Sequence, residues 1–122
     1  VKNPDYMFIF DTSLLEIPKV YNTIKEGVTL IANSDSPIKT DNLPENIKIY
    51  LIDATGICIK NNFMHSSGPI LNIPMLGAFG KFTGYYDLEV MKKVLNEEFG
   101  EEKAKLNIKV AEDAFNSVEE MK

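Results

Sequence analysis

Three short apolar runs in the first half of the chain, each closed by polar residues, constrain its fold more than any other feature. They are Tyr6 to Phe10, Val28 to Asn33 and Ile47 to Ile52. Apolar residues follow one another in these runs instead of alternating with polar ones, which is typical of strands buried on both faces of a parallel sheet. The runs therefore predict an α/β fold with right-handed crossovers between successive strands.

Between the strands, the sequence predicts one short helix and one long polar loop. Proline is tolerated in a helix only in the first turn, so Pro18 is expected to begin a helix. This helix is expected to reach Glu26 and to end at Gly27. The segment Ser34 to Asn46 holds two prolines and is mostly polar, which favours an irregular loop. A loop of this length invites a functional interpretation.

The second half of the chain predicts mainly helices. We expect one helix from Thr55 to Phe63, with Asp53 or Thr55 as its N-cap, and then a loop from Met64 to Pro69. In the stretch Ile70 to Gly84, the glycines at positions 77, 80 and 84 form one stripe if the segment is helical, so a neighbouring backbone can approach closely there. Gly84 can instead be the C-cap glycine of that helix.

Two further helices are expected before the end of the chain. The first runs from Leu88 to Phe99, with Asp87 as its N-cap and Gly100 ending it, and the second carries an apolar stripe from Ala104 to Val118. The acidic pairs at 97–98, 101–102 and 119–120 are interpreted as solvated helix faces. The fold class that follows is α/β, with a mostly parallel sheet and a mainly helical C-terminal half.

Size and charge exclude several classes of function. The 122 residues fit one domain, 1–122, and thirteen lysines against eighteen acids give a net charge of -5, the wrong sign for a nucleic-acid partner. No apolar run approaches the length of about 18 residues that spans a membrane, and no signal peptide is apparent, so a cytoplasmic protein is expected. One cysteine and one histidine are too few for a zinc or iron–sulfur site.

Each residue that carries chemistry also has a plain structural interpretation. Asp11 and Asp53 end strands, where ligands bind in open α/β sheets, but capping alone explains both, and capping is favoured. Cys58 and His65 are one possible nucleophile and base, yet a buried cysteine and a loop histidine are the simpler interpretation. Phosphate-binding glycine motifs and hydrolase motifs are absent, so no complete catalytic site is predicted.

Several motifs, in order along the chain, resemble the gamma subunit of the 2-oxoacid:ferredoxin oxidoreductases. The block Met75 to Ala78 is the most specific of them. The full set is Pro4-Asp5, Asp11 to Glu16, Asp53 to Gly56, Asn72 to Lys81, Thr83-Gly84, Leu106-Asn107 and Ala111-Glu112. The family's glycine-rich segment before the first strand is not present, and the chain begins almost directly in a strand. The sequence is therefore expected to be the C-terminal two thirds of a gamma-subunit domain.

The resemblance implies a three-layer, Rossmann-like α/β domain. It also implies a non-catalytic subunit of a complex that oxidatively decarboxylates a 2-oxoacid, with pyruvate as the expected substrate, to an acyl-coenzyme A and reduces ferredoxin. It implies partners of the alpha, beta and delta types, with ferredoxin contacted indirectly. Thiamine diphosphate, magnesium, iron–sulfur clusters and coenzyme A are implied for the whole complex, and none of these cofactors is expected in this chain.

The same resemblance suggests which residues face the partner subunits. They are Asn72, Met75, Leu76, Gly77, Ala78 and Lys81. The alternative is that Met75 and Leu76 are core residues, that Gly77 only lets a helix pack, and that Lys81 complements a helix C-terminus. Two other hypotheses stay open for the whole chain. One is a Rossmann-like module that binds a nucleotide or coenzyme A without a redox role, and the other is a small enzyme that depends on Cys58.

Overall fold

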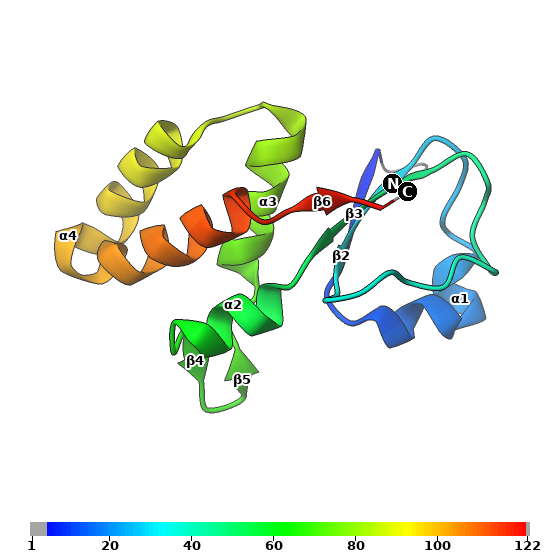
Figure 1. The fold of residues 1–122 in the computed structure, drawn as a ribbon, viewed down its shortest axis with the longest axis horizontal. Helices are drawn as coiled ribbons and strands as arrows, with labels where there is room; N and C mark the ends of the chain where they lie inside the picture. Colours follow the sequence, from blue (N-terminus) through cyan, green and yellow to red (C-terminus); the bar gives the residue numbers. More distant parts are fainter. Residues whose placement is uncertain (1–4, 122) are drawn as a thin grey trace. The chain divides into compact units, whose positions relative to one another are not determined.

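The computed structural model describes residues 5–121, which fall into two compact units (Figure 1). The first unit contains the chain up to Ile52 and the segment from Glu119 onward, and the second unit runs from Asp53 to Val118. Helices α2, α3 and α4 all belong to the second unit, whereas the main sheet belongs to the first. The helical second half and the mostly parallel sheet confirm the predicted α/β class, and the three-layer arrangement stays a prediction.

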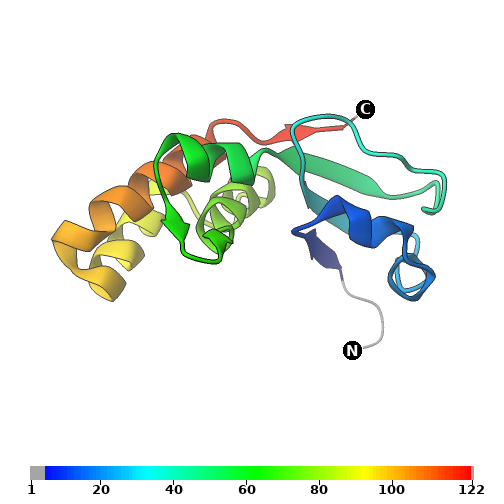
Figure 2. The same cartoon turned by 90° about the horizontal axis from the view of Figure 1, so that it is seen from below.

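The sheet of the first unit has the strand order β1-β2-β3-β6, from one edge of the sheet to the other (Figure 2). Strands β1 (Tyr6–Ile9), β2 (Thr29–Asn33) and β3 (Lys48–Ile52) are parallel and reproduce the three predicted runs within a residue at each end. The short β6 (Glu119–Glu120) adds antiparallel to β3. The acidic pair 119–120 is therefore not the helix face that the sequence predicted, because its backbone completes the sheet.

The core of the first unit lies on one face of this sheet. In register across the strands, Leu30 of β2 lies between Met7 of β1 and Ile49 of β3. Leu15 and Ile24, which lie between β1 and β2 in the chain, are buried in the same cluster. Only the central strand β2 is buried on both faces, so the expectation of full burial fails for β1 and β3, whose residues are partly exposed.

The connection from β1 to β2 differs from its prediction. A 3-10 helix, η1 (Thr12–Glu16), comes first, and helix α1 (Pro18–Tyr21) is four residues long instead of reaching Glu26. The chain turns after Tyr21, where the Thr23 hydroxyl donates to the Val20 carbonyl at 2.6 Å, and the turn allows Ile24 to enter the core. The connection from β2 to β3 is the irregular polar loop that the sequence predicted.

The second unit is built from three helices and a small hairpin. Helix α2 (Ala54–Lys60) is followed by β4 (Met64–His65) and β5 (Gly68–Pro69), which pair antiparallel where the sequence predicted a loop. The longest helices are α3 (Asn72–Thr83) and α4 (Leu88–Phe115), which pack against each other.

Helix α4 is two helical segments joined at Gly100. That glycine has a φ of 79° and a ψ of 156°, a conformation that favours glycine, and it separates the two helices that the sequence predicted. The second segment ends at Phe115 and not at Val118. Gly84, with a φ of 70°, is the left-handed C-cap of α3, which confirms that interpretation.

Candidate functional site

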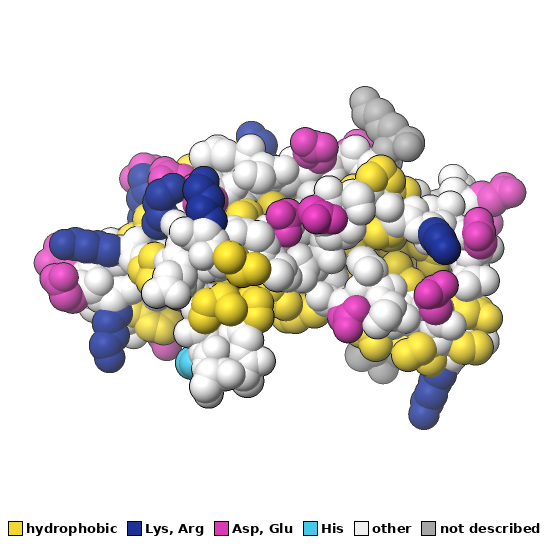
Figure 3. Space-filling view, turned by 60° about the horizontal axis from the view of Figure 1, so that its bottom comes forward, with side chains coloured by type: hydrophobic (Ala, Val, Ile, Leu, Met, Phe, Trp, Pro, Cys, Tyr) yellow, Lys and Arg dark blue, Asp and Glu magenta, His cyan; other side chains and the backbone are white. Residues whose placement is uncertain are grey.

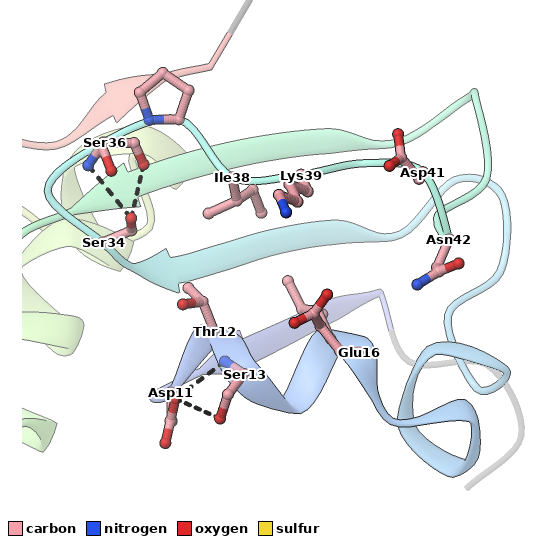
Figure 4. A pocket seen from close by; sticks show the side chains of 12 residues that line it. Asp11, Thr12, Ser13, Glu16, Ser34, Ser36, Ile38, Lys39, Asp41 and Asn42 are labelled. Atoms are coloured by element: carbon pink, nitrogen blue, oxygen red, sulfur yellow. Dashed lines mark hydrogen bonds between the residues drawn. The ribbon is translucent and has the colours of Figure 1, made fainter.

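A polar cavity of about 390 Å³ lies at the carboxyl ends of β1 and β2 (Figure 4). In parallel sheets this edge is where ligands usually bind, because the connecting segments there bring polar groups together. One wall comes from η1 and the residues around it, and the other comes from the loop that follows β2. The lining residues are Asp11, Thr12, Ser13, Leu15, Glu16, Ser34, Ser36, Pro37, Ile38, Lys39, Asp41 and Asn42.

Asp11 is a capping residue at the rim of this cavity. Its Oδ1 accepts hydrogen bonds from the Ser13 amide at 3.0 Å and from the Ser13 hydroxyl at 2.8 Å, drawn as dashed lines in Figure 4. These two hydrogen bonds lower the pKa of the Asp11 carboxyl below its usual value. Asp11 therefore does what the capping interpretation requires, and it also contributes a fixed negative charge to the cavity.

The opposite wall is held by short-range hydrogen bonds. Ser34 donates its hydroxyl to the Ser36 carbonyl at 2.7 Å and accepts the Ser36 amide at 3.3 Å. The amide of Asn33, at the end of β2, donates to the Phe10 carbonyl just after β1, at 3.1 Å. These bonds fix the two strand ends and the first residues of the loop next to each other.

The chemistry of the cavity is that of a binding site. It presents hydroxyl groups, carboxylates including Glu16, the amide of Asn42 and the single amine of Lys39. Its lining contains neither cysteine nor histidine, so no pair of nucleophile and base is built there. Glu16, Lys39 and Asn42 were not singled out from the sequence. The only signal for the last two was the length and polarity of the loop that carries them.

Asp53, the second strand-end carboxylate, does not line this cavity. It belongs to the second unit and is the N-cap of α2, where its Oδ1 accepts the Gly56 amide at 2.9 Å. The capping interpretation thus accounts for Asp53 completely. Of the two predicted strand-end residues, only Asp11 is part of the cavity.

Cys58 and His65 have the ordinary structural roles that the sequence favoured. Cys58 is buried in α2, its thiol donates to the Ile70 carbonyl at 3.2 Å, and burial raises the pKa of the thiol. A raised pKa makes a thiol a poor nucleophile at neutral pH. His65 is exposed in the short strand β4.

The predicted interface block is divided by burial. Met75 is 1% exposed, Ala78 is fully buried, and Gly77 packs against the backbone of Ala111 in α4, so these three serve internal packing. Leu76, in contrast, is 46% exposed. The interface stays a prediction, and the block residues that reach the surface are Asn72, Leu76 and Lys81.

Lys81 has a partner within its own unit. Its Nζ lies 5.1 Å from the centroid of the Phe115 ring, which is a cation–π contact between α3 and the end of α4. Lys81 stays on the surface, but its ammonium group already interacts with the Phe115 ring. The position of Lys81 is therefore explained without a bound anion.

On the face drawn in Figure 3, acidic and lysine side chains intermix over the helical unit, as solvated helix faces do. Within residues 5–121, no group of three or more histidine, cysteine, aspartate or glutamate side chains is placed to hold a metal ion. In the same residues, no helix combines the length and apolar character that crossing a membrane requires.

Comparison with known proteins identifies the family of the chain, which the cavity alone does not. The family model described as pyruvate ferredoxin/flavodoxin oxidoreductase matches residues 1–117. The chain belongs to this family. The chain is also similar to "Pyruvate synthase subunit PorC" of Methanothermobacter marburgensis, to which it is 35% identical over 122 residues. The match covers all of this chain and 63% of that relative.

A second relative is "Pyruvate/ketoisovalerate oxidoreductases common subunit gamma" of Thermococcus kodakarensis, which is 32% identical over 121 residues. That match covers 95% of this chain and 62% of the relative. The chain therefore spans somewhat less than two thirds of the length of these curated relatives. These matches confirm the resemblance to the gamma subunits that the sequence motifs suggested.

Solved structures of the family share the fold. The pyruvate oxidoreductase subunit PORC of Thermotoga maritima superimposes with a TM-score of 0.80 at 26% identity, covering all of this chain and 67% of that one. A 2-oxoglutarate:ferredoxin oxidoreductase from Magnetococcus marinus gives a TM-score of 0.68 at 21% identity, covering 90% of this chain and 19% of that one. The second similarity concerns the fold alone.

Proposed function

We propose that this chain is part of the non-catalytic gamma subunit of a cytoplasmic 2-oxoacid:ferredoxin oxidoreductase, with pyruvate as the substrate. The complex converts the 2-oxoacid and coenzyme A to an acyl-coenzyme A and carbon dioxide while ferredoxin is reduced. The observation that carries the proposal is the family match over residues 1–117, together with 35% identity to a pyruvate synthase subunit.

The chemistry of these residues agrees with a supporting role. Iron–sulfur clusters are held by several cysteine thiolates, and the 122 residues contain only Cys58, which is buried. A magnesium ion that holds a diphosphate needs grouped oxygen ligands, and residues 5–121 bring no such group of carboxylates together. In this proposal, as the family resemblance implies, the clusters, thiamine diphosphate and magnesium belong to companion subunits of the alpha, beta and delta types.

The proposal includes a place for the chain within the domain and the complex. We place residues 1–122 in the C-terminal two thirds of a single gamma-subunit domain. We further propose that Asn72, Leu76 and Lys81, the exposed residues of the block on α3, lie toward the subunits that hold thiamine diphosphate.

Reconstitution tests the proposal. The chain is co-expressed anaerobically with the alpha, beta and delta type subunits of the same organism, and pyruvate-dependent reduction of ferredoxin is measured with and without coenzyme A. We expect activity in a complex that contains the chain and none from the chain alone. Turnover by the purified chain alone, or a fully assembled and active complex that excludes it, would refute the proposal.

A second function is favoured by one specific observation, the polar cavity at the carboxyl ends of β1 and β2. Its hydroxyl groups, Asn42 and Lys39 suit the ribose, amide and phosphate groups of a nucleotide or of coenzyme A. Calorimetry with coenzyme A, ATP and AMP distinguishes the two functions. Tight binding by the isolated chain that Lys39→Ala weakens tenfold would favour the binding module without a redox role.

A further inference from the structure

We propose that the apolar groove between α3 and the first segment of α4 binds an amphipathic helix of a companion subunit, one with lysine or arginine beside its apolar stripe. This inference rests on the proposed function, since only a subunit of a larger complex has such a companion. It names the chemistry of the contact, which the family match does not give.

The groove is a formed, entirely apolar cavity of about 250 Å³. Leu76 comes from α3, and α4 contributes Val90, Met91, Val94 and Leu95. Met91 and Leu95 are buried and form the floor, whereas the walls are exposed, with Val90 at 48% and Val94 at 54%. Exposed apolar residues gathered around a hollow mark an interaction site more than the same residues scattered singly do.

Contacts of Tyr86 hold one end of the groove. The Tyr86 hydroxyl donates to the Leu76 carbonyl at 2.8 Å, and the Tyr86 ring lies against Gly80, so one end of the groove is fixed to α3. Val90 and Val94 are one helical turn apart and present a ridge. A ridge of this kind packs against apolar residues at i, i+3 and i+4 of an incoming helix.

Charge at the ends of this ridge identifies the partner. Asp87 is the N-cap of α4, where its carboxylate accepts the Val90 amide at 2.9 Å. Glu97 and Glu98 follow Val94 by three and four residues, so the three acids lie at the two ends of the Val90–Val94 ridge. All three are exposed, and among the described residues neither glutamate forms an ion pair.

Lys93 is the single lysine on the flank of the ridge, whereas Lys92 is already paired with Glu89 and Glu112. The surroundings of the groove are therefore acidic. A second copy of this chain, with its net charge of -5 and the same acids around its groove, is repelled. A companion helix with basic residues next to its apolar stripe is complementary both to the apolar groove and to the acids around it.

Photo-cross-linking in the assembled complex tests the contact. p-Benzoylphenylalanine replaces Val94, and in a matched control it replaces Ile59, which lies on α2 and is 62% exposed. We expect cross-links from position 94 to map to one helix of a companion subunit that carries lysine or arginine, and few from position 59. Cross-links to another copy of this chain, to the same chain or to an acidic or non-helical segment would overturn the inference.

Charge reversal tests the partner's sign. Glu97→Lys combined with Glu98→Lys is expected to weaken the chain's affinity for its companions about tenfold at low salt, with a smaller loss at high salt. Glu101→Lys with Glu102→Lys, the same charge change beyond Gly100, is expected to have little effect. Equal effects of the two pairs would overturn the inference. If the unmodified chain itself fails to assemble, the proposed function fails first, so the two failures are distinguishable.

Discussion

At the scale of single residues, Gly77 is where the packing of α3 on α4 is closest. A Cβ atom at this position would overlap the carbonyl oxygen of Ala111 and lie 3.1 Å from its carbonyl carbon, which are backbone atoms that cannot rotate away. We therefore expect Gly77→Ala to lower the free energy of unfolding by about 2 kcal/mol, the usual cost of overpacking a core. Urea denaturation followed by circular dichroism measures the change.

Gly80 provides the matched control. A Cβ atom there would meet the ring of Tyr86, which is side chain and not backbone, so Gly80→Ala is expected to cost less than Gly77→Ala. Equal stability of wild type and Gly77→Ala would mean that the two helices do not approach as closely as described. The test also separates internal packing from an interface role, because it uses the chain by itself.

Asp113 joins α2 to α4 and gives the protein a pH-dependent contact. Its Oδ1 accepts Lys109 Nζ at 2.6 Å, and its Oδ2 accepts the Asn61 amide at 2.9 Å. Burial raises the pKa of this carboxyl, but the hydrogen bonds from Lys109 and Asn61 and the charges of Lys109 and Lys60 outweigh burial, so the pKa is lowered. A lowered pKa stabilises the fold above the unfolded value of 3.8, and this stability is lost as the pH falls through the folded pKa.

Asp113→Asn is expected to destabilise the protein by about 1 kcal/mol at pH 7 and by less at pH 2, because the contribution of the charge declines as the pH falls below the unfolded value of 3.8. Urea titrations at both pH values measure the difference. Lys105→Ala, which removes an exposed ion pair with Glu102 on the same helix, serves as the control and should be nearly neutral. A loss of the same size at both pH values would contradict the assigned role of the charge.

At the scale of elements, Asp53 stabilises α2 by capping its N-terminus. Its carboxylate accepts the Gly56 amide, so Asp53→Ala is expected to lower the free energy of unfolding by about 1 kcal/mol. Asp53→Asn keeps an acceptor oxygen and should restore most of that stability, since asparagine caps nearly as well as aspartate. Thermal melts of both variants measure the effect, and an asparagine variant as unstable as the alanine one would point to a role for the charge itself.

The strands were predictable because their signal is local. Leu30, Ile31 and Ala32 follow one another with no polar residue between them, and Asn33 ends the run, so both the type and the end of β2 are encoded in the segment itself. The break at Gly100 and the cap at Asp87 were predictable for the same reason. A glycine with positive φ and a side-chain acceptor at a helix start are properties of single residues.

Elements that depend on distant contacts were not predictable. The strand β6 forms because Glu119 and Glu120 pair with the edge of β3, about 70 residues earlier in the chain. Two consecutive glutamates do not by themselves indicate a strand. Helix α1 stops at Tyr21 because Ile24 is needed in the core beside Leu30. Tertiary burial there outweighs the helix propensity of the segment.

The candidate cavity was half predictable. Asp11 was chosen because it ends a strand, and the cavity does lie at that strand end. Glu16 and Lys39 were missed because they line the same cavity only once η1 and the loop after β2 fold toward each other. For Met75 and Ala78, the resemblance named a block of residues but could not separate core from surface, which only the packing of α3 on α4 decides.

At the scale of the whole molecule, the chain leaves the first unit after Ile52 and returns to it at Glu119. The returning segment pairs with β3, where the Met121 amide donates to the Ile49 carbonyl at 2.8 Å, and Met121 packs against the apolar cluster. The second unit, in contrast, is continuous in sequence. The stability of the first unit therefore depends on residues from both ends of the chain, and that of the second does not.

Deleting residues 119–122 should consequently destabilise one unit and not the other. The deletion removes the backbone hydrogen bonds of β6 and the packing of Met121, about 2 kcal/mol in all, so amide hydrogen exchange in β2 and β3 should become at least tenfold faster. Exchange in α3 and α4 should change little. Glu119→Gln with Glu120→Gln keeps the backbone pairing and should leave both units protected. Faster exchange throughout the chain would mean that the two units unfold as one, and that the returning segment stabilises the whole molecule and not only the sheet it completes.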